Sequence, residues 1–333
     1  MKTWVKVLLI TLATIYVVST VIVVVKIYRL VKTAKKTRQA YGKTWMNSNK
    51  CGSNNCYALV TDLPIPTQDG TSYNTDVARY CADLVVRVEN PAHKDGEGGP
   101  ILIPKGLTKI TDLYNDSKSP IFGVVLTDGH VAWISFRGTQ SAQEWIQDMH
   151  YGQSSLIPST KKNQDHSQKV LKLRGVETLP SIHNGFLEAY NSCADDINKA
   201  LQQIKPTQII ITGHSLGASV SCIAALAIVN NGYTNVIVYN FACPMTGDPV
   251  FCNLISQKNI PIYRHTNACD IVPTLPSSVS ANYDSPNSPY IYTQCGVTVP
   301  FSDNWLSMEN NHLMGVYVNA FNKGLYTSFK QVK

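Results

Sequence analysis

The sequence predicts an α/β fold with a largely parallel central sheet. Runs of β-branched and apolar residues, each long enough for a buried strand, alternate with stretches whose apolar residues recur at helical spacing. Such alternation is typical of sheets whose parallel strands are connected by helices. A chain of 333 residues is also long enough to bury the core of one enzyme-sized domain. We therefore expect a functional site beyond the carboxyl ends of the strands.

The first segment of the chain predicts a membrane-spanning helix. Residues 7–25 carry no charge and lie between Lys6 and Lys26. At about 1.5 Å per residue they come close to the roughly 30 Å of a bilayer's hydrocarbon core. A cleaved signal peptide is the alternative, which the length of the apolar run and the basic residues after it disfavour. The expected parts are a transmembrane helix, a basic linker and a globular domain, over residues 1–26, 27–50 and 51–333.

The net charge of +7 is concentrated ahead of this domain. Nine Lys and Arg lie in the first 43 residues, which hold no Asp or Glu, so 20 basic and 22 acidic residues remain for the rest of the chain. This near-neutral remainder lacks the basic footprint of a nucleic-acid-binding protein. Seven basic residues follow the apolar run and two precede it. The positive-inside bias therefore predicts a domain on the cytosolic side, with a basic flank that is solvated or rests on anionic headgroups.

The nine cysteines are scattered and form no C-x-x-C pair, so we expect no zinc site. The scatter fits free thiols in a reducing compartment, although Cys51 and Cys56 could pair if the domain lay outside. No other metal and no organic cofactor is expected, and the sequence carries no signal for the oligomeric state.

The elements before the middle of the chain are expected to be a helix, a hairpin and a long loop. Apolar residues at helical spacing predict a helix over 73–88. Two strand-like runs over 121–126 and 131–136 are joined through Thr127-Asp128-Gly129, a hairpin signal. Residues 151–181 are polar and predict a surface loop, after which a helix is expected over 183–204.

A short helix with one apolar face is expected over residues 141–150. Its apolar side chains recur at i, i+3, i+4 and i+7, at Ala142, Trp145, Ile146 and Met149. The pattern alone favours packing against the core, and a lid over an apolar cleft is the alternative.

The stretch 207–230 carries the strongest functional signal. A β-branched run over 208–212 leads into Gly213-His214-Ser215-Leu216-Gly217, which is followed by a small, apolar helical segment. A strand that turns sharply into a helix needs residues without bulk on both sides of the turn, and the turn exposes the serine hydroxyl. This context predicts a nucleophile elbow with Ser215 as the nucleophile, against the alternative of an ordinary strand–helix turn.

A nucleophilic serine needs a base and an orienting acid, which hydrolases of this architecture supply in the order Ser, Asp or Glu, His. Strands are expected over 235–241 and 260–265, and Asp270 follows directly after the second of these. His312 is the only histidine downstream of Asp270, which makes it the expected base, whereas His265 lies within the strand and is expected to be structural. Asp248 is the alternative acid; Asp284 and Asp303 are also downstream.

These residues resemble the class 3 lipases, the fungal-type triacylglycerol lipase family of α/β-hydrolases. The resemblance runs from Tyr73 to the C-terminus and rests on ordered blocks. The blocks are Phe136-Arg137-Gly138-Thr139 with Trp145 and Asp148, His183-Asn184-Gly185-Phe186, the elbow with Ala218, Phe241-Ala242-Cys243-Pro244 with Gly247-Asp248-Pro249, Asp270-Ile271-Val272-Pro273-Thr274-Leu275-Pro276, and His312.

The resemblance implies an α/β-hydrolase fold and favours Asp270 over Asp248 as the acid. It also implies that residues 141–150 form a lid, that Thr139 is an oxyanion residue, and that Asp148 supports it. Two departures concern the substrate: the loop between Asp148 and His183 is longer than in the compact secreted fungal members, and those members lack the membrane anchor.

The function expected from these residues is hydrolysis of lipid esters at a membrane through an acyl-enzyme. His312 is expected to remove the Ser215 proton while Asp270 orients and stabilises the imidazole. The N–H of Leu216 and the N–H and hydroxyl of Thr139 are the expected oxyanion donors. The substrate is expected to be an acylglycerol or phospholipid. A small-ester or phenolic-ester hydrolase and a catalytically silent, membrane-anchored binding module are the alternatives.

Overall fold

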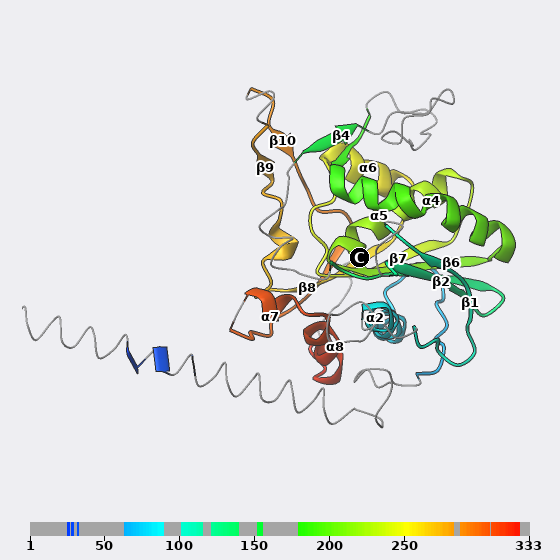
Figure 1. The fold of residues 1–333 in the computed structure, drawn as a ribbon, viewed down its shortest axis with the longest axis horizontal. Helices are drawn as coiled ribbons and strands as arrows, with labels where there is room; N and C mark the ends of the chain where they lie inside the picture. The colour runs from blue at the N-terminus through cyan, green and yellow to red at the C-terminus, as the bar shows by residue number, and fades with distance from the viewer. Residues whose placement is uncertain are drawn as a thin grey trace, which may run out of the picture.

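A computed structural model gives the fold of the chain (Figure 1). It describes residues 25–26, 28–29, 32, 63–89, 101–115, 121–139, 152–155, 179–282, 287–306 and 308–326. Most of the expected membrane span, the linker from residue 33, Cys51, Cys56, Asp148 and the four lid residues Ala142, Trp145, Ile146 and Met149 lie outside these ranges. Within them, no helix combines the length and the apolar composition needed to cross a bilayer.

The predicted largely parallel sheet is confirmed and has seven strands in the order β1-β2-β3-β6-β7-β8-β11. The first two pairings are antiparallel, which confirms the predicted hairpin, and the four from β3 to β11 are parallel. The strands are β1 (Thr108–Leu113), β2 (Gly123–Thr127), β3 (Val131–Phe136), β6 (Gln208–His214), β7 (Val236–Phe241), β8 (Ile262–Asn267) and β11 (Val297–Phe301).

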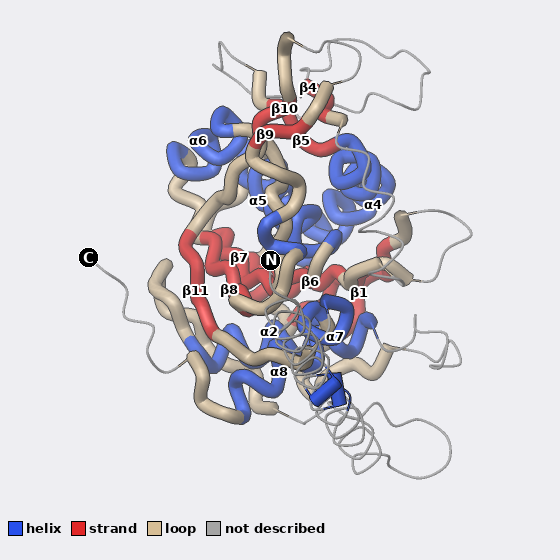
Figure 2. Tube along the Cα trace, turned by 90° about the vertical axis from the view of Figure 1, so that its left-hand side faces the viewer, coloured by secondary structure: helices blue, strands red, loops and turns tan. Residues whose placement is uncertain are grey.

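Helices cover both faces of the sheet (Figures 1 and 2). One face carries α4 (Asn184–Ile204), α5 (Leu216–Asn230) and α6 (Pro249–Gln257), and the other carries α2 (Thr75–Glu89), α7 (Met308–His312) and α8 (Met314–Asn322). The strand period of two divides β6 between these layers, because Ile209 and Ile211 join the core under α4 and α5 while Ile210 joins the core over α2 and α8.

The unit of β6 and α5 lies at the centre of this core. Every residue of β6 is buried, and α5 is buried from Leu216 to Ile228. Full burial of a Val, Leu or Ile side chain stabilises the folded state by about 1.5–3 kcal/mol, so the eight buried side chains of these types in the two elements anchor the turn between them firmly. The serine in that turn is therefore attached to two buried elements of the core.

Several short elements were not predicted from the sequence. β4 (Gln153–Ser155) pairs antiparallel with β5 (Ser181–His183), so the segment predicted as a loop over 151–181 contains β4 and the first residue of β5. No helix was predicted at Pro249, where α6 begins because Asp248 caps it and proline is compatible with the first helical turn. A short hairpin of β9 (Val279–Ser280) and β10 (Tyr290–Ile291) follows the 3-10 turn η2 (Val272–Thr274).

The expectation of free thiols is wrong for one pair of cysteines. Cys252 in α6 and Cys295 ahead of β11 form a disulfide, with Cα atoms 4.9 Å apart. Two residues 43 positions apart in the chain meet because the segment ahead of β11 runs beside the start of α6, where Thr293 pairs with Gly247, a proximity that spacing alone does not reveal. Among the described cysteines, Cys81, Cys193, Cys222, Cys243 and Cys269 are free thiols.

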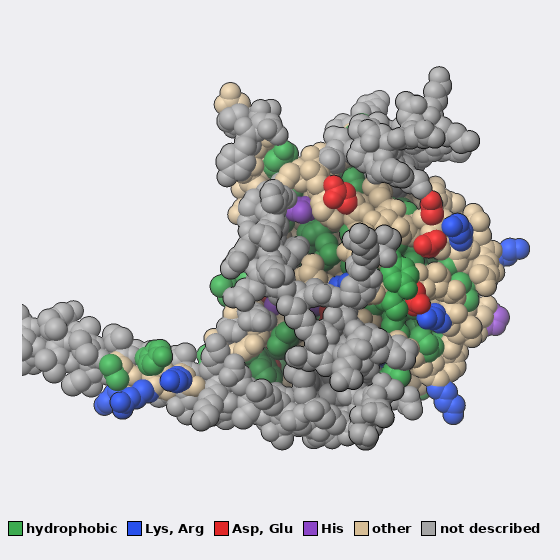
Figure 3. Space-filling view, viewed as in Figure 1, with side chains coloured by type: hydrophobic (Ala, Val, Ile, Leu, Met, Phe, Trp, Pro, Cys, Tyr) green, Lys and Arg blue, Asp and Glu red, His purple; other side chains and the backbone are tan. Residues whose placement is uncertain are grey.

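The charged side chains of the described residues give no continuous basic surface on the face in Figure 3, where Lys and Arg are interspersed with Asp and Glu. The helical residues Lys26, Arg29 and Lys32 form a separate basic stretch on the N-terminal segment. The charge distribution over the visible face thus matches the near-neutral composition of the domain.

Candidate active site

Ser215 occupies a sharp turn between β6 and α5. Its backbone has φ 55° and ψ −123°, a conformation that L-residues seldom adopt outside constrained sites. The turn is possible because the chain crosses itself closely at its two glycines. A β-carbon at Gly213 would collide with the carbonyl group of Gly217, and one at Gly217 would lie 2.5 Å from the carbonyl oxygen of Arg137. Glycine is required at both positions for this close approach.

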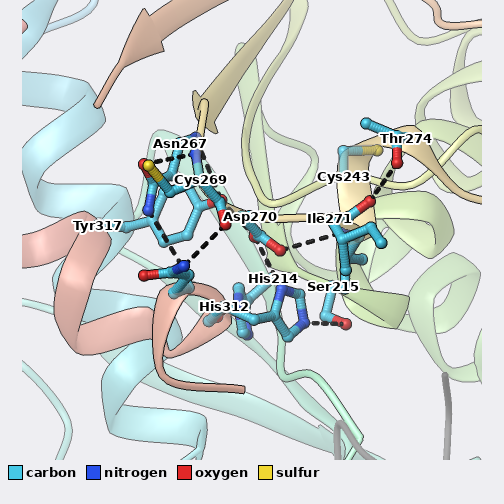
Figure 4. A network of polar contacts seen from close by, with 12 residues as sticks. His214, Ser215, Cys243, Asn267, Cys269, Asp270, Ile271, Thr274, His312 and Tyr317 are labelled. Carbon is cyan, nitrogen blue, oxygen red and sulfur yellow. Dashed lines mark hydrogen bonds and ion pairs between the residues drawn. The ribbon is translucent and has the colours of Figure 1, made fainter. Parts of the chain in front are cut away.

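The structure brings Ser215, His312 and Asp270 into one hydrogen-bonded line (Figure 4). The Ser215 Oγ lies 2.8 Å from Nε2 of His312, and Nδ1 of His312 lies 2.9 Å from Oδ2 of Asp270. All three side chains are buried. Because a carboxylate can only accept, Nδ1 carries the ring proton, which leaves the lone pair of Nε2 to accept the serine hydroxyl.

Asp270 is held by two further donors. Its Oδ1 accepts the backbone N–H of Val272 at 3.0 Å, and its Oδ2 accepts the hydroxyl of Tyr317 at 2.6 Å. Burial, followed by the negative charge of Asp270, holds the pKa of Tyr317 well above its usual value, so this hydroxyl remains a donor. The sequence reasoning missed Tyr317, since a tyrosine in an apolar C-terminal helix carries no signal of this contact.

Two asparagines join the acid loop to the segment that carries the base. Nδ2 of Asn267, at the end of β8, donates to the carbonyl oxygens of Asp303 and Asn311, at 2.8 and 3.3 Å. Nδ2 of Asn311 donates back to the carbonyl oxygen of Cys269 at 2.9 Å. These bonds fix the residue before Asp270 and the residue before His312 against one another, so the two catalytic candidates are positioned through their backbones.

The electrostatic surroundings of His312 favour its neutral form. Burial lowers the pKa of His312 below its usual value, and the opposing attraction of Asp270 does not restore it. His214, whose ring centroid lies 4.7 Å from that of His312, also lowers this pKa. A neutral imidazole with a free lone pair at Nε2 is the form that can accept a proton from a hydroxyl.

The backbone beside Ser215 supplies candidate oxyanion donors. Leu216 begins α5, so its N–H is among those at the helix N-terminus that lack a partner within the helix. A β-carbon at Gly138 would lie 3.2 Å from the β-carbon of Ser215, which brings the segment ending in Thr139 against the nucleophile. Arg137 holds this segment by donating to the carbonyl oxygens of Ile121 and Gly138, each at 2.7 Å. The oxyanion roles of Thr139 and Leu216 remain predictions.

The other candidates have structural roles. Asp248 caps α6 by accepting the N–H of Phe251 at 2.8 Å. His265 is buried within β8, where its ring lies 3.0 Å from the carbonyl oxygen of Asn240 and 3.1 Å from the hydroxyl of Tyr73. In the described part of the chain, no group of three or more His, Cys, Asp and Glu is arranged to hold a metal ion.

Comparison with known proteins identifies the relatives of this chain. The family model described as Lipase (class 3) matches residues 133–280, which confirms the resemblance found in the sequence. "Secreted mono- and diacylglycerol lipase 1" of Fusarium solani is 28% identical over 229 residues, covering 65% of this chain and 62% of the relative. "Phospholipase A1-II 3" of Oryza sativa subsp. japonica is 34% identical over 200 residues, covering 50% and 44%.

Among solved structures, lipase II from Rhizopus niveus superimposes with a TM-score of 0.50 at 20% identity. The match covers 68% of this chain and 82% of that one. This likeness concerns the fold, and it agrees with the α/β-hydrolase architecture of a mostly parallel sheet between two helical layers. The chain spans between 44% and 62% of the length of the two curated relatives described above.

Proposed function

We propose that the protein is a serine hydrolase of lipid esters, on the premise that residues 133–280 match the family model described as Lipase (class 3). The observation that carries the proposal is the line from Ser215 through His312 to Asp270, built on a strained turn at the carboxyl edge of the sheet. The line supports the proposal because acyl transfer by a serine needs a nucleophile, a base and an orienting acid within hydrogen-bond reach of one another.

The proposed reaction begins with attack of the Ser215 oxygen on the ester carbonyl carbon. His312 accepts the hydroxyl proton at Nε2 as the new carbon–oxygen bond forms, and Asp270 stabilises the resulting imidazolium through Nδ1–H. The imidazolium then gives its proton to the leaving alcohol, which leaves the acyl group on Ser215. A water molecule activated by the same imidazole hydrolyses this acyl-enzyme and releases the fatty acid.

The proposed oxyanion donors are the N–H of Leu216 and the N–H and hydroxyl of Thr139. They are fixed by elements that are already in place before the substrate binds: α5 for Leu216, and the end of β3, held by Arg137, for Thr139. A donor fixed in this way stabilises the developing charge without reorganisation, an effect worth about 3 kcal/mol per donor.

The proposed substrate class is an acylglycerol or a phospholipid. The relatives named above are a mono- and diacylglycerol lipase and a phospholipase A1, and both names describe lipid esters. The apolar face over residues 141–150, proposed here as a lid, is suited to contact with acyl chains, and Asp148 is proposed to support the oxyanion residue Thr139.

We further propose that residues 7–25 anchor the enzyme in a membrane, with the basic flank and the catalytic domain on the cytosolic side. The uncharged run and the excess of basic residues after it support this arrangement. The disulfide between Cys252 and Cys295 opposes the cytosolic side, because disulfides persist mainly in oxidising compartments. Digestion of sealed membrane vesicles by an added protease decides the side. In right-side-out vesicles, which keep the cytosolic face inside, a cytosolic domain is protected and an external domain is digested.

The activity is tested with the full-length chain in detergent micelles and in lipid vesicles. Wild-type protein is expected to release fatty acid from diacylglycerol or phosphatidylcholine in vesicles, and Ser215→Ala to lose at least about 10³-fold of this rate. Ser256→Ala changes an exposed serine of α6 and serves as the matched control with unchanged rate.

Two further measurements separate the alternatives. A fluorophosphonate probe is expected to label the wild-type protein at Ser215 and to leave Ser215→Ala unlabelled. Equal hydrolysis by the wild type and Ser215→Ala, or a wild type that the probe fails to label, contradicts the serine-hydrolase proposal. Hydrolysis of p-nitrophenyl butyrate without any activity on vesicles would assign the protein to the small-ester hydrolases instead.

A further inference from the structure

A buried line of contacts runs behind the nucleophile, from the Glu89 carboxylate through the His214 ring to the backbone carbonyl oxygen of His312, and none of these three groups takes part in the proposed reaction. His214 directly precedes Ser215, and its Nδ1 lies 2.6 Å from Oε1 of Glu89 at the end of α2. Its Nε2 lies 2.8 Å from the backbone carbonyl oxygen of His312. The side chains of His214 and Glu89 are only 7% and 12% exposed, so these contacts are largely shielded from water.

The partners of His214 determine its protonation. A carbonyl oxygen can only accept a hydrogen bond, so Nε2 must carry a proton, and an ionised Glu89 requires a proton on Nδ1 as well. The ring is then an imidazolium paired with a carboxylate. Burial by itself lowers the pKa of His214, but the charge and hydrogen bond of Glu89, helped by Asp270 and by the His312 carbonyl oxygen, raise it above the usual value.

Glu89 also holds the segment that leads to the oxyanion donors. The same Oε1 accepts the backbone N–H of Gly138 at 3.1 Å, and Gly138 directly precedes Thr139. A single carboxylate at the end of α2 thus contacts the segment after β3 and, through His214, the backbone of His312 at the end of α7. These segments are far apart in the chain and meet only around Ser215.

We propose that Glu89 and His214 are a positioning pair that holds the oxyanion segment and the base in register around the nucleophile. The inference rests on the proposed ester hydrolysis. Neither residue touches the reacting atoms in this scheme: Glu89 acts through the N–H of Gly138, and His214 acts through the carbonyl oxygen of His312.

The charge on His214 has a second effect on the base. The His214 ring faces Glu89 of α2 and Asp270 of the loop after β8. It also faces His312 of α7 and Tyr317 of α8, whose ring centroid lies 6.1 Å from that of His214. A cation beside His312 disfavours a second positive charge there, so it holds His312 in the neutral, proton-accepting form to lower pH.

Glu89→Gln tests the pair because it keeps the side-chain shape and removes the charge. His214 then loses its ion partner and can donate only one N–H. The expected result is a drop in kcat of about 100-fold, the size of effect produced by misplacing catalytic groups by about 1 Å, with little change in KM. The acid limb of the pH profile of kcat/KM is expected to move to higher pH, because the cation beside His312 is lost.

The matched control is Asp83→Asn, on the same helix. Asp83 forms a buried ion pair with Arg87 at 2.6 Å, so its loss destabilises α2 without touching the segments around Ser215. We expect it to lower the midpoint of thermal unfolding while kcat and the acid limb stay near wild type. If Glu89→Gln behaves in the same way, with a lower midpoint and wild-type kinetics, the pair is merely structural and the inference is overturned.

A readout without activity separates this inference from the proposed function. Nitrogen-15 NMR of the wild-type chain, with His214→Gln for assignment, is expected to show both ring nitrogens of His214 protonated at pH 7.5. A neutral His214 at this pH overturns the inference even in an active enzyme. A wild-type protein without Ser215-dependent hydrolysis overturns the proposed function. The NMR measurement does not depend on activity and tests the protonation of His214 independently.

Discussion

At the scale of the residue, Ser215 combines backbone strain with a fixed set of partners. A non-glycine residue at φ 55° costs on the order of 1–3 kcal/mol and persists only where the surrounding structure holds it. Here the buried β6–α5 unit holds it, and His312 receives its hydroxyl. The strained turn aims the serine oxygen at the base, which an unstrained strand-to-helix connection would not do.

Tyr317→Phe is expected to lower kcat/KM by about tenfold. The change deletes the hydroxyl that donates to Asp270 Oδ2 at 2.6 Å, and a hydrogen bond to a charged group is worth about 1.5–3 kcal/mol. Steady-state kinetics on a soluble ester measure the effect. Tyr326→Phe is the control, since its hydroxyl donates to the backbone of Tyr317 and does not contact the acid. An equal loss in both variants would show that the hydroxyl does not act through Asp270.

His265 predicts a specific loss of stability in acid. Burial lowers its pKa in the folded protein to about 3, whereas an unfolded histidine titrates near 6.5. The unfolded chain therefore takes up the proton first, and the free energy of unfolding falls as pH drops below about 6.5, by at most about 1.4 kcal/mol per pH unit, until about pH 3.

Urea unfolding of the wild type and of His265→Gln at pH 7.5 and pH 5 measures this contribution. Glutamine can still bond to the Asn240 carbonyl oxygen and the Tyr73 hydroxyl but does not titrate. The difference in unfolding free energy between the two proteins is expected to shrink at pH 5. Parallel pH dependence of the wild type and the variant would mean that the wild-type ring takes up its proton equally in both states.

At the scale of the element, three strand ends in the parallel part of the sheet each position one candidate functional segment. β3 leads to Thr139, β6 to Ser215 and β8 to Asp270, while α7 supplies His312 from outside the sheet. Because parallel strands end at the same edge, segments distant in the chain converge there. The prediction at this scale concerns the element that follows β7.

Asp248→Ala is expected to destabilise the protein by about 1 kcal/mol and to leave the kcat unchanged. The side chain caps α6 by accepting the N–H of Phe251, and loss of such a cap costs this amount. Chemical unfolding and ester hydrolysis measure the two effects, with Asp270→Asn as the comparison that is expected to lose most activity. A comparable loss of activity in Asp248→Ala would make Asp248 the acid after all.

At the scale of the whole molecule, two clusters of apolar side chains on opposite faces of the sheet hold the helical layers together. The Cys252–Cys295 disulfide adds a covalent connection between α6 and the segment that leads to the edge strand β11. An edge strand has only one neighbour in its sheet, so a crosslink beside it restrains the part of the sheet that is least constrained by pairing.

Replacing both Cys252 and Cys295 by Ala is expected to lower the free energy of unfolding by about 2–4 kcal/mol, because the disulfide restricts the unfolded chain. Thermal unfolding of the wild type with and without reductant gives an independent comparison, since the double variant is expected to be insensitive to the reductant at these positions. Mass spectrometry that finds both cysteines as free thiols in the wild type would contradict the pairing.

The predictability of each feature depends on how local its cause is. The turn around Ser215 was predictable because its glycines, its strand and its helix are contiguous in the chain, and His312 followed by elimination. β11 was not predictable, because Pro300 lies within it and proline is tolerated only at a sheet edge or a bulge. β1 contains the charged residues Lys109 and Asp112, so its sequence does not resemble a buried strand. These residues are tolerated because β1 is the strand at the other edge of the sheet.

The sequence alone determined the candidate residues and their order: a serine elbow, a carboxylate after a later strand and a final histidine. It could do so because these signals come from local patterns of neighbouring residues and from the order of residue types along the chain. The tertiary structure alone decided which distant groups support them: Tyr317 on Asp270, Glu89 and His214 behind the base, and Cys252 with Cys295. These contacts join segments that approach one another only when the sheet and both helical layers have packed, so no local pattern encodes them.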